Sequence, residues 1–178
     1  MQPQPLKIAV TGPESTGKSA LCEALARHYD TVWVPEFART HLVDQAPPYT
    51  RETLDYIADG QTAAEQEAEP HAYRLLFCDT EMTVMKVWSE HAFGHCTPHI
   101  QDLYNRQSYD LYLLADIDLP WEPDPLREHP HLRSHFFEKY REALSEAGRP
   151  FKVISGLGIQ RLHNAILEIE KLGFEPVV

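Results

Sequence analysis

Residues 12–19 combine the residue types of a phosphate-binding loop at the required spacing. They read GPESTGKS and fit the pattern G-x-x-x-x-G-K-[ST] at every fixed position. The glycines let backbone N–H groups wrap a polyphosphate, while Lys18 can reach the β- and γ-phosphates and Ser19 can bind Mg²⁺. We therefore expect ATP and Mg²⁺ to bind at Gly12, Pro13, Glu14, Ser15, Thr16, Gly17, Lys18, Ser19 and Ala20. The alternative is a glycine-rich turn that caps an ordinary helix.

Two acidic residues follow other apolar runs that read as strands. Asp79 comes directly after residues 74–78, and Glu36 follows residues 31–35. Ligands of open α/β sheets bind outside the carboxyl ends of the strands, so both carboxylates are candidates for the same site. Asp79 stands where a Walker-B acid holds Mg²⁺, although an Asp here can equally be a helix N-cap. Glu36 could accept the proton of an attacking hydroxyl, and Arg39 could bind phosphate or form a surface salt bridge with Glu36.

The elements that must position these residues alternate along the chain. Apolar runs predict strands at 6–11, 31–35, 74–78, 111–115 and 151–155. Helical composition and spacing predict helices at 20–26, 51–69, 132–146 and 158–171, and a helical region at 81–106 broken near Gly94 and Pro98. A proline-rich turn is expected at residues 47–48. This alternation predicts an α/β P-loop NTPase fold, a five-stranded parallel sheet with helices on both faces. We expect the strand at 74–78 to lie beside the strand at 6–11.

The segment 116–131 is rich in proline and charge and has the placement of a lid. Closing it over the transferring phosphoryl group would exclude water and bring Arg127 or Arg133 close. An ordinary polar loop stiffened by proline is the alternative. Arg161, just after the glycines at 156 and 158, could lie near the nucleotide base or cap the sheet edge.

Composition limits the classes of function. The chain has 178 residues and a net charge of −11, which argues against sequence-independent nucleic-acid binding. No signal peptide opens the sequence and no apolar run reaches the length of a membrane span, so we expect a cytoplasmic protein with no membrane partner. The cysteines show no metal-type spacing, and whether His91, His95, Cys96 and His99 bind a metal stays open.

Several motifs together resemble NadR-type ribosylnicotinamide kinases and their AAA-like relatives. The resemblance spans nearly the whole chain. It is carried by the phosphate loop with its glutamate and by Pro35-Glu36-Phe37-Ala38-Arg39, Ile57-Ala58-Asp59-Gly60-Gln61, Phe77-Cys78-Asp79-Thr80, Tyr109-Asp110-Leu111-Tyr112-Leu113-Leu114 and Leu119-Pro120-Trp121.

The resemblance implies a single kinase domain at 1–178 that uses ATP to phosphorylate the 5′-hydroxyl of nicotinamide riboside. Lys18 and Ser19 would serve ATP and Mg²⁺, and Arg127 would be the lid arginine. Glu36 and Asp79 would lie by the acceptor ribose and the metal, in roles that could be exchanged. Acceptor contacts are expected at Glu36, Arg39, Gln61, Asp79 and Trp121.

Two departures from the family pattern affect the acceptor side and the lid. The expected Asp-Gly-x-Arg is Asp124-Pro125-Leu126-Arg127 here, which predicts a stiffer hinge. Pro35 precedes Glu36 and Gln61 has no aromatic neighbour, so these motifs assure no ring to stack on nicotinamide. A kinase of another nucleoside or nucleotide remains an alternative, as does a regulatory P-loop ATPase that acts on a protein partner. The sequence leaves the oligomeric state open.

Overall fold

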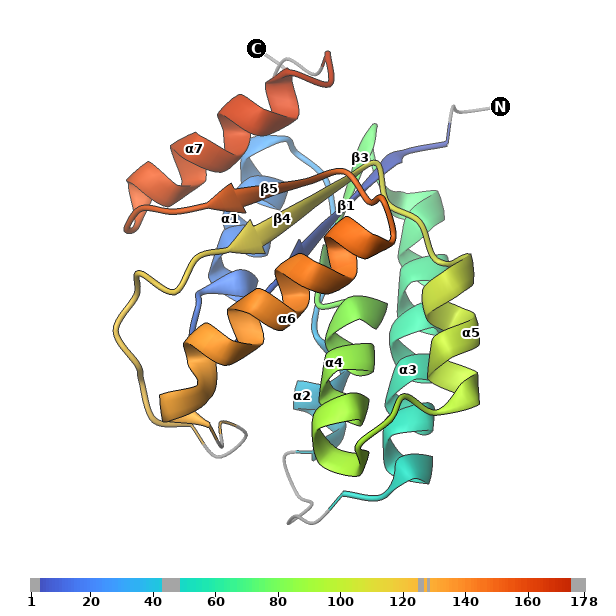
Figure 1. Cartoon of the computed structure of the whole chain (residues 1–178). Coiled ribbons are helices and arrows are strands. Elements are labelled where there is room, and N and C mark those ends of the chain that lie inside the picture. Colours follow the sequence, from blue (N-terminus) through green and yellow to red (C-terminus); the bar gives the residue numbers. More distant parts are fainter. Residues whose placement is uncertain (1–3, 43–48, 125–126, 128, 174–178) are drawn as a thin grey trace.

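A parallel β-sheet forms the centre of the computed structural model, which describes residues 4–42, 49–124, 127 and 129–173 (Figure 1). Its strands are β1 (Leu6–Thr11), β2 (Trp33–Val34), β3 (Leu75–Asp79), β4 (Leu111–Ala115) and β5 (Phe151–Ile154). Their order is β2-β3-β1-β4-β5, and every neighbouring pair is parallel. The predicted five-stranded parallel sheet is confirmed, as is the position of β3 beside β1.

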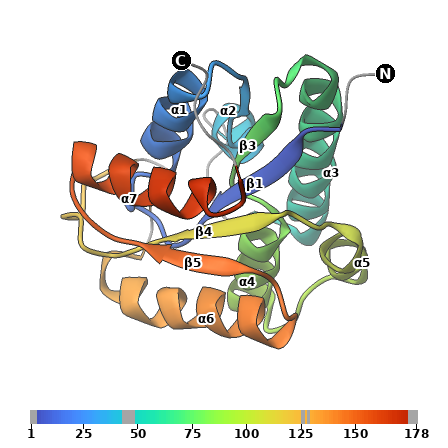
Figure 2. The same ribbon diagram turned by 90° about the horizontal axis from the view of Figure 1, so that it is seen from above.

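The helices cover both faces of this sheet. In the described residues they are α1 (Lys18–His28), α2 (Phe37–Leu42), α3 (Arg51–Ala68), α4 (Met82–Phe93), α5 (Pro98–Arg106), α6 (Arg133–Glu146) and α7 (Ile159–Glu170), with 3-10 turns at Glu69–His71 and Pro130–Leu132. Figure 2 shows α1 and α7 on one side of the sheet and α4 and α6 on the other. The break expected between 81 and 106 is present, since Gly94 ends α4 and Pro98 begins α5.

The helix α2 has six residues and directly follows Glu36. It was not among the helices predicted from the sequence. It is too short to show an apolar period. The proline-rich turn expected at residues 47–48 lies outside the described residues, as does Pro125 in the lid.

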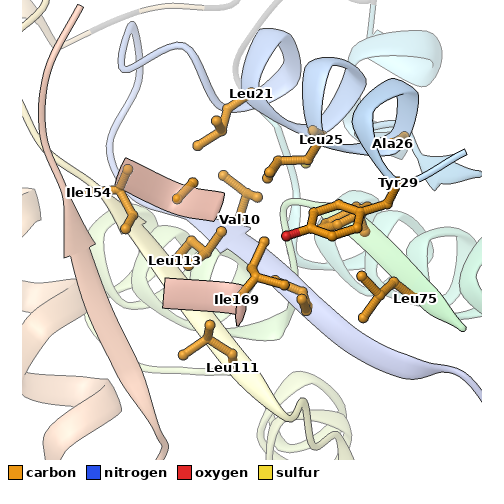
Figure 3. Close-up of a cluster of buried hydrophobic side chains, with 14 residues drawn as sticks. Val10, Leu21, Leu25, Ala26, Tyr29, Leu75, Leu111, Leu113, Ile154 and Ile169 are labelled. Atoms are coloured by element: carbon orange, nitrogen blue, oxygen red, sulfur yellow. The ribbon is translucent and has the colours of Figure 1, made fainter. Parts of the chain in front are cut away.

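Strand residues alternate between two apolar cores. Ile8 and Val10 of β1 pack toward α1 and α7, where they join Phe77 and Leu113 from the neighbouring strands (Figure 3). Ala9 points the other way, into the cluster that includes residues of α4 and α6. This alternation follows from the period of two in a strand, and burial on both faces explains why these strands are apolar throughout.

A third cluster packs the helices beyond the sheet edge against each other. Its buried residues come from α2 to α5: Ala38, Leu42, Leu54, Ile57, Ala58, Met82, Met85, Ile100 and Tyr104. The short α2 is therefore held by packing against α3 and α4. Among the described residues no helix has the length and apolar character needed to cross a membrane.

One charged pair is buried at the other end of β1. The carboxylate of Glu65 in α3 is 1% exposed, and its Oε2 lies 2.8 Å from Nζ of Lys7. Its Oε1 accepts a hydrogen bond of 2.5 Å from the hydroxyl of Tyr109. Removing one partner of a buried pair leaves the other charge uncompensated, which costs more than an exposed pair contributes.

We therefore expect Lys7→Met to lower the free energy of unfolding by about 3 kcal/mol, because it leaves the Glu65 carboxylate buried without its cation. Urea denaturation followed by circular dichroism measures this. Lys139→Met is the matched control, since Lys139 pairs with Glu142 on the exposed surface of α6. Equal midpoints for the two variants would contradict the expectation.

Candidate functional site

The loop between β1 and α1 is shaped for close approach of a ligand to the backbone. Gly12 has φ 131°, and a Cβ at this position would lie 3.0 Å from the carbonyl oxygen of Ala115 on the neighbouring strand. Gly17, at φ 74°, caps α1, and no side chain bonds to the first backbone N–H groups of that helix. These N–H groups carry the positive end of the helix dipole. The loop therefore presents an anion site at the carboxyl end of β1.

Two side chains of the loop turn back onto its own backbone. Lys18 Nζ donates to the carbonyl of Pro13 at 2.9 Å, and the hydroxyl of Thr16 donates to the same oxygen at 2.8 Å. The Lys18 ammonium thus lies over the loop, where the β- and γ-phosphates of a nucleotide would lie in a P-loop fold.

Asp79 ends β3 directly beside the start of α1. Its Oδ2 accepts a hydrogen bond of 2.5 Å from the hydroxyl of Ser19. The residue is 1% exposed, and no side chain or backbone group of the described residues bonds to its Oδ1. Burial raises the pKa of Asp79 to about 6, against the lowering effect of Lys18 and with a further rise caused by the charge of Glu36.

These two residues fit a magnesium site. Mg²⁺ prefers hard oxygen ligands and keeps several waters, so it needs only one or two protein groups beside the nucleotide phosphates. The Ser19 hydroxyl and the Asp79 carboxylate supply such oxygens, and the unpartnered Oδ1 leaves one acceptor available. In the described part of the chain, no three His, Cys, Asp or Glu residues form a cluster that could hold a metal without a nucleotide.

Glu36 lies on the cavity wall next to α2. Its carboxylate is 24% exposed, far more than that of Asp79. Arg39, one turn further on, has its Nη1 2.9 Å from Oδ2 of Asp124 and its Nε 3.8 Å from Oε2 of Glu36. The Arg39 cation is therefore largely balanced by two carboxylates, one of them from the segment after β4.

A cavity of about 440 Å³ joins the phosphate loop to Glu36, Arg39 and Arg127. Its apolar lining residues include Tyr49, Val84, Val87, Trp88, Phe136 and Tyr140. The rings of Tyr49 and Trp88 meet edge to face with centroids 5.6 Å apart. The cavity lining thus combines charged groups with aromatic rings.

These wall residues were missing from the sequence prediction. Three of them come from α4, where Val84, Val87 and Trp88 lie at helical spacing. The start of this helix three residues after Asp79 was the available signal, because a helix that leaves the carboxyl end of a strand borders the ligand site. The rings that the Glu36 and Gln61 motifs did not assure are supplied by other elements.

The segment between β4 and α6 contacts the phosphate loop at Ser15 (Figure 1). The Ser15 hydroxyl accepts a hydrogen bond of 3.0 Å from the backbone N–H of Glu122 and one of 3.4 Å from Arg127. Arg133 donates to the carbonyls of Ser15 and Leu119 at 3.1 and 2.8 Å. Ser15 has φ 56°, a left-handed conformation that a non-glycine residue adopts rarely.

Arg161 is buried beneath the site. It is 4% exposed, and its guanidinium donates to the carbonyls of Thr16 at 2.6 Å, Gly156 at 2.8 Å and Asp116 at 3.2 Å. It also pairs with the carboxylate of Asp118. Arg161 therefore joins the phosphate loop to the segments that directly follow β4 and β5. It is absent from the described cavity lining.

Gln61 and Trp121 also lie outside that lining. Gln61 is 1% exposed, accepts a hydrogen bond from Phe37 N at 2.9 Å and donates to the carbonyl of Thr80 at 3.3 Å. Trp121 is half-buried in the segment after β4. Of the residues proposed from sequence, the cavity brings together residues 12–20, Glu36, Arg39 and Arg127, with Asp79 directly behind Ser19.

The histidines and cysteine considered for a metal site are separated into different contacts. They are His91, His95, Cys96 and His99. His99 pairs with Asp59 on the surface at 2.7 Å, whereas the ring of His91 packs edge to face against Phe136 in the cavity. Within the described part of the chain, these four residues form no group that could hold a metal ion.

Comparisons with known proteins agree with this geometry. The family model described as "AAA domain" matches residues 7–161. The trifunctional NAD biosynthesis/regulator protein NadR of Escherichia coli (strain K12) is 29% identical over 124 residues, which cover 67% of this chain. The match covers 30% of that protein, so the chain spans less than a third of this curated relative.

Two solved structures share the fold over almost the whole chain. A NadR protein in complex with NR superposes with a TM-score of 0.83 at 20% identity, covering 98% of this chain and 52% of that one. A NadR protein in complex with NAD and AMP-PNP superposes with a TM-score of 0.81 at 22% identity, covering 98% and 51%. At these identities the likeness establishes the fold.

The burial of Asp79 predicts a pH-dependent stability. Its pKa of about 6 lies above the ordinary 3.8, so between these values the unfolded chain binds fewer protons than the folded one. The contribution of Asp79 to stability therefore falls as pH rises through this window and is lowest above about pH 6. Asp79→Asn removes the titrating group and should be more stable than wild type at pH 7, by roughly 2 kcal/mol.

Urea denaturation of both proteins at several pH values between 4 and 7 measures this difference. It should grow as pH rises. Asp102→Asn is the control, because Asp102 lies on the exposed face of α5 and pairs with Arg106. A difference between Asp79→Asn and wild type that does not change with pH would contradict the expectation.

Proposed function

The chain belongs to the AAA domain family, and we propose that it is an ATP-dependent kinase that converts nicotinamide riboside to nicotinamide mononucleotide in NAD biosynthesis. The E. coli relative supports this, since its name places it in NAD biosynthesis. The two superposed NadR structures add support, because one contains NR and the other contains the ATP analogue AMP-PNP.

The observation that carries the proposal is a cavity whose lining combines the phosphate loop, an acidic residue and aromatic rings. The loop residues, Glu36 and the aromatic pair Tyr49 and Trp88 line the same cavity. A riboside with a planar base suits this arrangement. Its base would pack against the rings, and its 5′-hydroxyl would point toward Glu36 and the γ-phosphate.

The different burial of the two carboxylates supports different roles in the proposed reaction. Glu36 is accessible from the cavity, and we propose that it orients the acceptor hydroxyl and takes its proton. Asp79 is held by Ser19 behind the loop, which supports a role on the metal side. Ser19 and Asp79, together with the phosphates, would hold Mg²⁺, which would neutralise charge that develops on the phosphoryl oxygens.

Lys18 and Arg127 supply positive charge to the cavity. Phosphoryl transfer depends mainly on positioning and on stabilisation of charge, and both side chains carry positive charge next to the phosphate loop. We propose that residues 116–131 act as the lid, with Arg127 turning from the carbonyl of Glu122 to the transferring phosphoryl group. In this reading residues 1–178 form one kinase domain.

The charge pattern favours a nucleoside over a nucleotide as acceptor. Arg39, the cation nearest to Glu36, is paired with Asp124 and lies close to Glu36 itself. An acceptor phosphate would have to compete with two carboxylates for this guanidinium. A neutral or cationic acceptor meets no such competition, and nicotinamide riboside carries a positive ring.

The two alternatives are less well supported. A regulatory ATPase that signals to a protein partner has no need of an acidic residue and aromatic walls beyond the γ-phosphate. A kinase of another nucleoside shares the cavity and differs only in the ring that it selects. We also propose that the chain has no nucleic-acid partner, because its net charge is −11. A cytoplasmic location is proposed as well, as expected from the sequence.

A panel of acceptors tests the function. The protein is incubated with Mg·ATP and nicotinamide riboside, adenosine, deoxyadenosine, thymidine or nicotinamide mononucleotide, and ADP release is measured with the product identified by mass spectrometry. We expect stimulation by nicotinamide riboside and none by its mononucleotide. Stimulation by another nucleoside alone would replace the named substrate, and slow ADP release that no acceptor changes would favour the regulatory ATPase.

Substitutions of Lys18 and Glu36 should have different effects. Lys18→Ala should abolish turnover because the cation over the phosphates is lost, with the fold retained. Glu36→Gln should lower kcat by about 100-fold or more with little change in KM for ATP, since it removes the proton acceptor. Lys152→Ala and Glu142→Gln, on the exposed surface, are the matched controls. Turnover at the wild-type rate in Lys18→Ala would remove the proposed function.

A further inference from the structure

The side chain of Gln61 connects the two segments that carry Glu36 and Asp79. Its Oε1 accepts a hydrogen bond of 2.9 Å from the backbone N–H of Phe37, the residue after Glu36. Its Nε2 donates to the carbonyl of Thr80 at 3.3 Å and approaches that of Asp79 at 3.5 Å. Gln61 itself lies in the middle of α3 and is 1% exposed.

The uncharged amide of glutamine suits this connection. One end must accept from an N–H and the other must donate to a carbonyl, which glutamine does and glutamate or methionine does not. Both backbone groups need a partner. Phe37 N begins α2, where a helix provides no acceptor of its own. Thr80 follows the last residue of β3 and has a left-handed φ of 73°, so its carbonyl lies beyond the strand.

The neighbouring glycine serves the same connection. A Cβ at Gly60 would lie 2.2 Å from the ring of Phe37, so only glycine lets this ring pack against α3. The ring and the backbone N–H of Phe37 are thus both held by α3, through Gly60 and Gln61 respectively. These contacts fix the position of the start of α2, and with it Glu36, relative to α3.

The connection works against a repulsion. Glu36 follows β2 and Asp79 ends β3, and these two strands are neighbours in the sheet. Two like charges in one site favour a larger separation, and β2 offers little resistance because it has only two residues. Hydrogen bonds from a rigid helix to both backbones oppose that movement.

We propose that Gln61 is a positioning residue that fixes the distance between Glu36 and Asp79, the carboxylates on the two sides of the transferring phosphoryl group. This inference rests on the proposed function for its kinetic consequence, but the hydrogen-bonded bridge itself does not. Gln61 touches no substrate in this account, which replaces the acceptor contact expected from its sequence motif.

The test compares Gln61→Met with Gln107→Met. Gln107 makes a similar bridge away from the cavity, accepting from Met82 N and donating to Glu65, each at 3.1 Å. Both variants should lose stability to a similar extent. Only Gln61→Met should lower kcat, by about 10- to 100-fold, with KM values for ATP and nicotinamide riboside within about twofold of wild type.

Amide hydrogen exchange gives a readout that needs no activity. In Gln61→Met the Phe37 amide loses its acceptor and should exchange at least tenfold faster than in wild type, while in Gln107→Met it should not. Unchanged exchange at Phe37 would overturn the bridge whatever the kinetics. An equal kcat loss in both variants, or a Gln61→Met effect confined to the KM of the riboside, would overturn the positioning role. If wild type phosphorylates no riboside, the proposed function fails and the exchange result still decides the bridge.

Discussion

The parallel register between β1 and β3 is the constraint on which the site depends. Val10 pairs with Asp79, and the N–H of Thr80 bonds to the carbonyl of Val10 at 3.1 Å. Because the loop that follows β1 leads directly into α1, this register brings the Asp79 carboxylate to the hydroxyl of Ser19. A slip of one residue would turn Asp79 to the opposite face of the sheet. The apolar residues of both strands, packed on both faces, hold the register and so carry the cost of burying a carboxylate.

The charged residues of the site were predictable from sequence because most of them lie close together along the chain. The phosphate loop, its lysine and its serine occupy neighbouring positions, and the strand before them is a continuous apolar run. Asp79 and Glu36 were found by a rule that needs only the strand ends. The aromatic residues of the cavity lining were not predicted from sequence, since Tyr49, Trp88 and Phe136 belong to three different parts of the chain. Their meeting depends on how α4 and α6 pack, which no short motif records.

Buried polar residues show the same limit from the other side. From sequence, Arg161 was open between a contact with the nucleotide base and a cap of the sheet edge, and Gln61 was expected at the acceptor from the family resemblance. Each instead satisfies backbone groups that are far away along the chain: Arg161 reaches a carbonyl 145 positions earlier, and Gln61 reaches one 19 positions later. Their partners are defined only by the tertiary structure. The family motif that contains Gln61 is therefore better explained by the geometry of Glu36 than by contact with substrate.

Three arginines lie around the phosphate loop of this acidic chain. Arg127, Arg133 and Arg161 all donate to backbone carbonyls in or next to the loop, and Asp118 is the acid paired with Arg161. Burial lowers the pKa of Arg133, as does its proximity to Arg127 and Arg161. Carbonyl bonds fix the positions of Arg127 and Arg133 without neutralising their charge. In a chain with a net charge of −11, cations are thus kept beside the loop, where a triphosphate would lie in the proposed function.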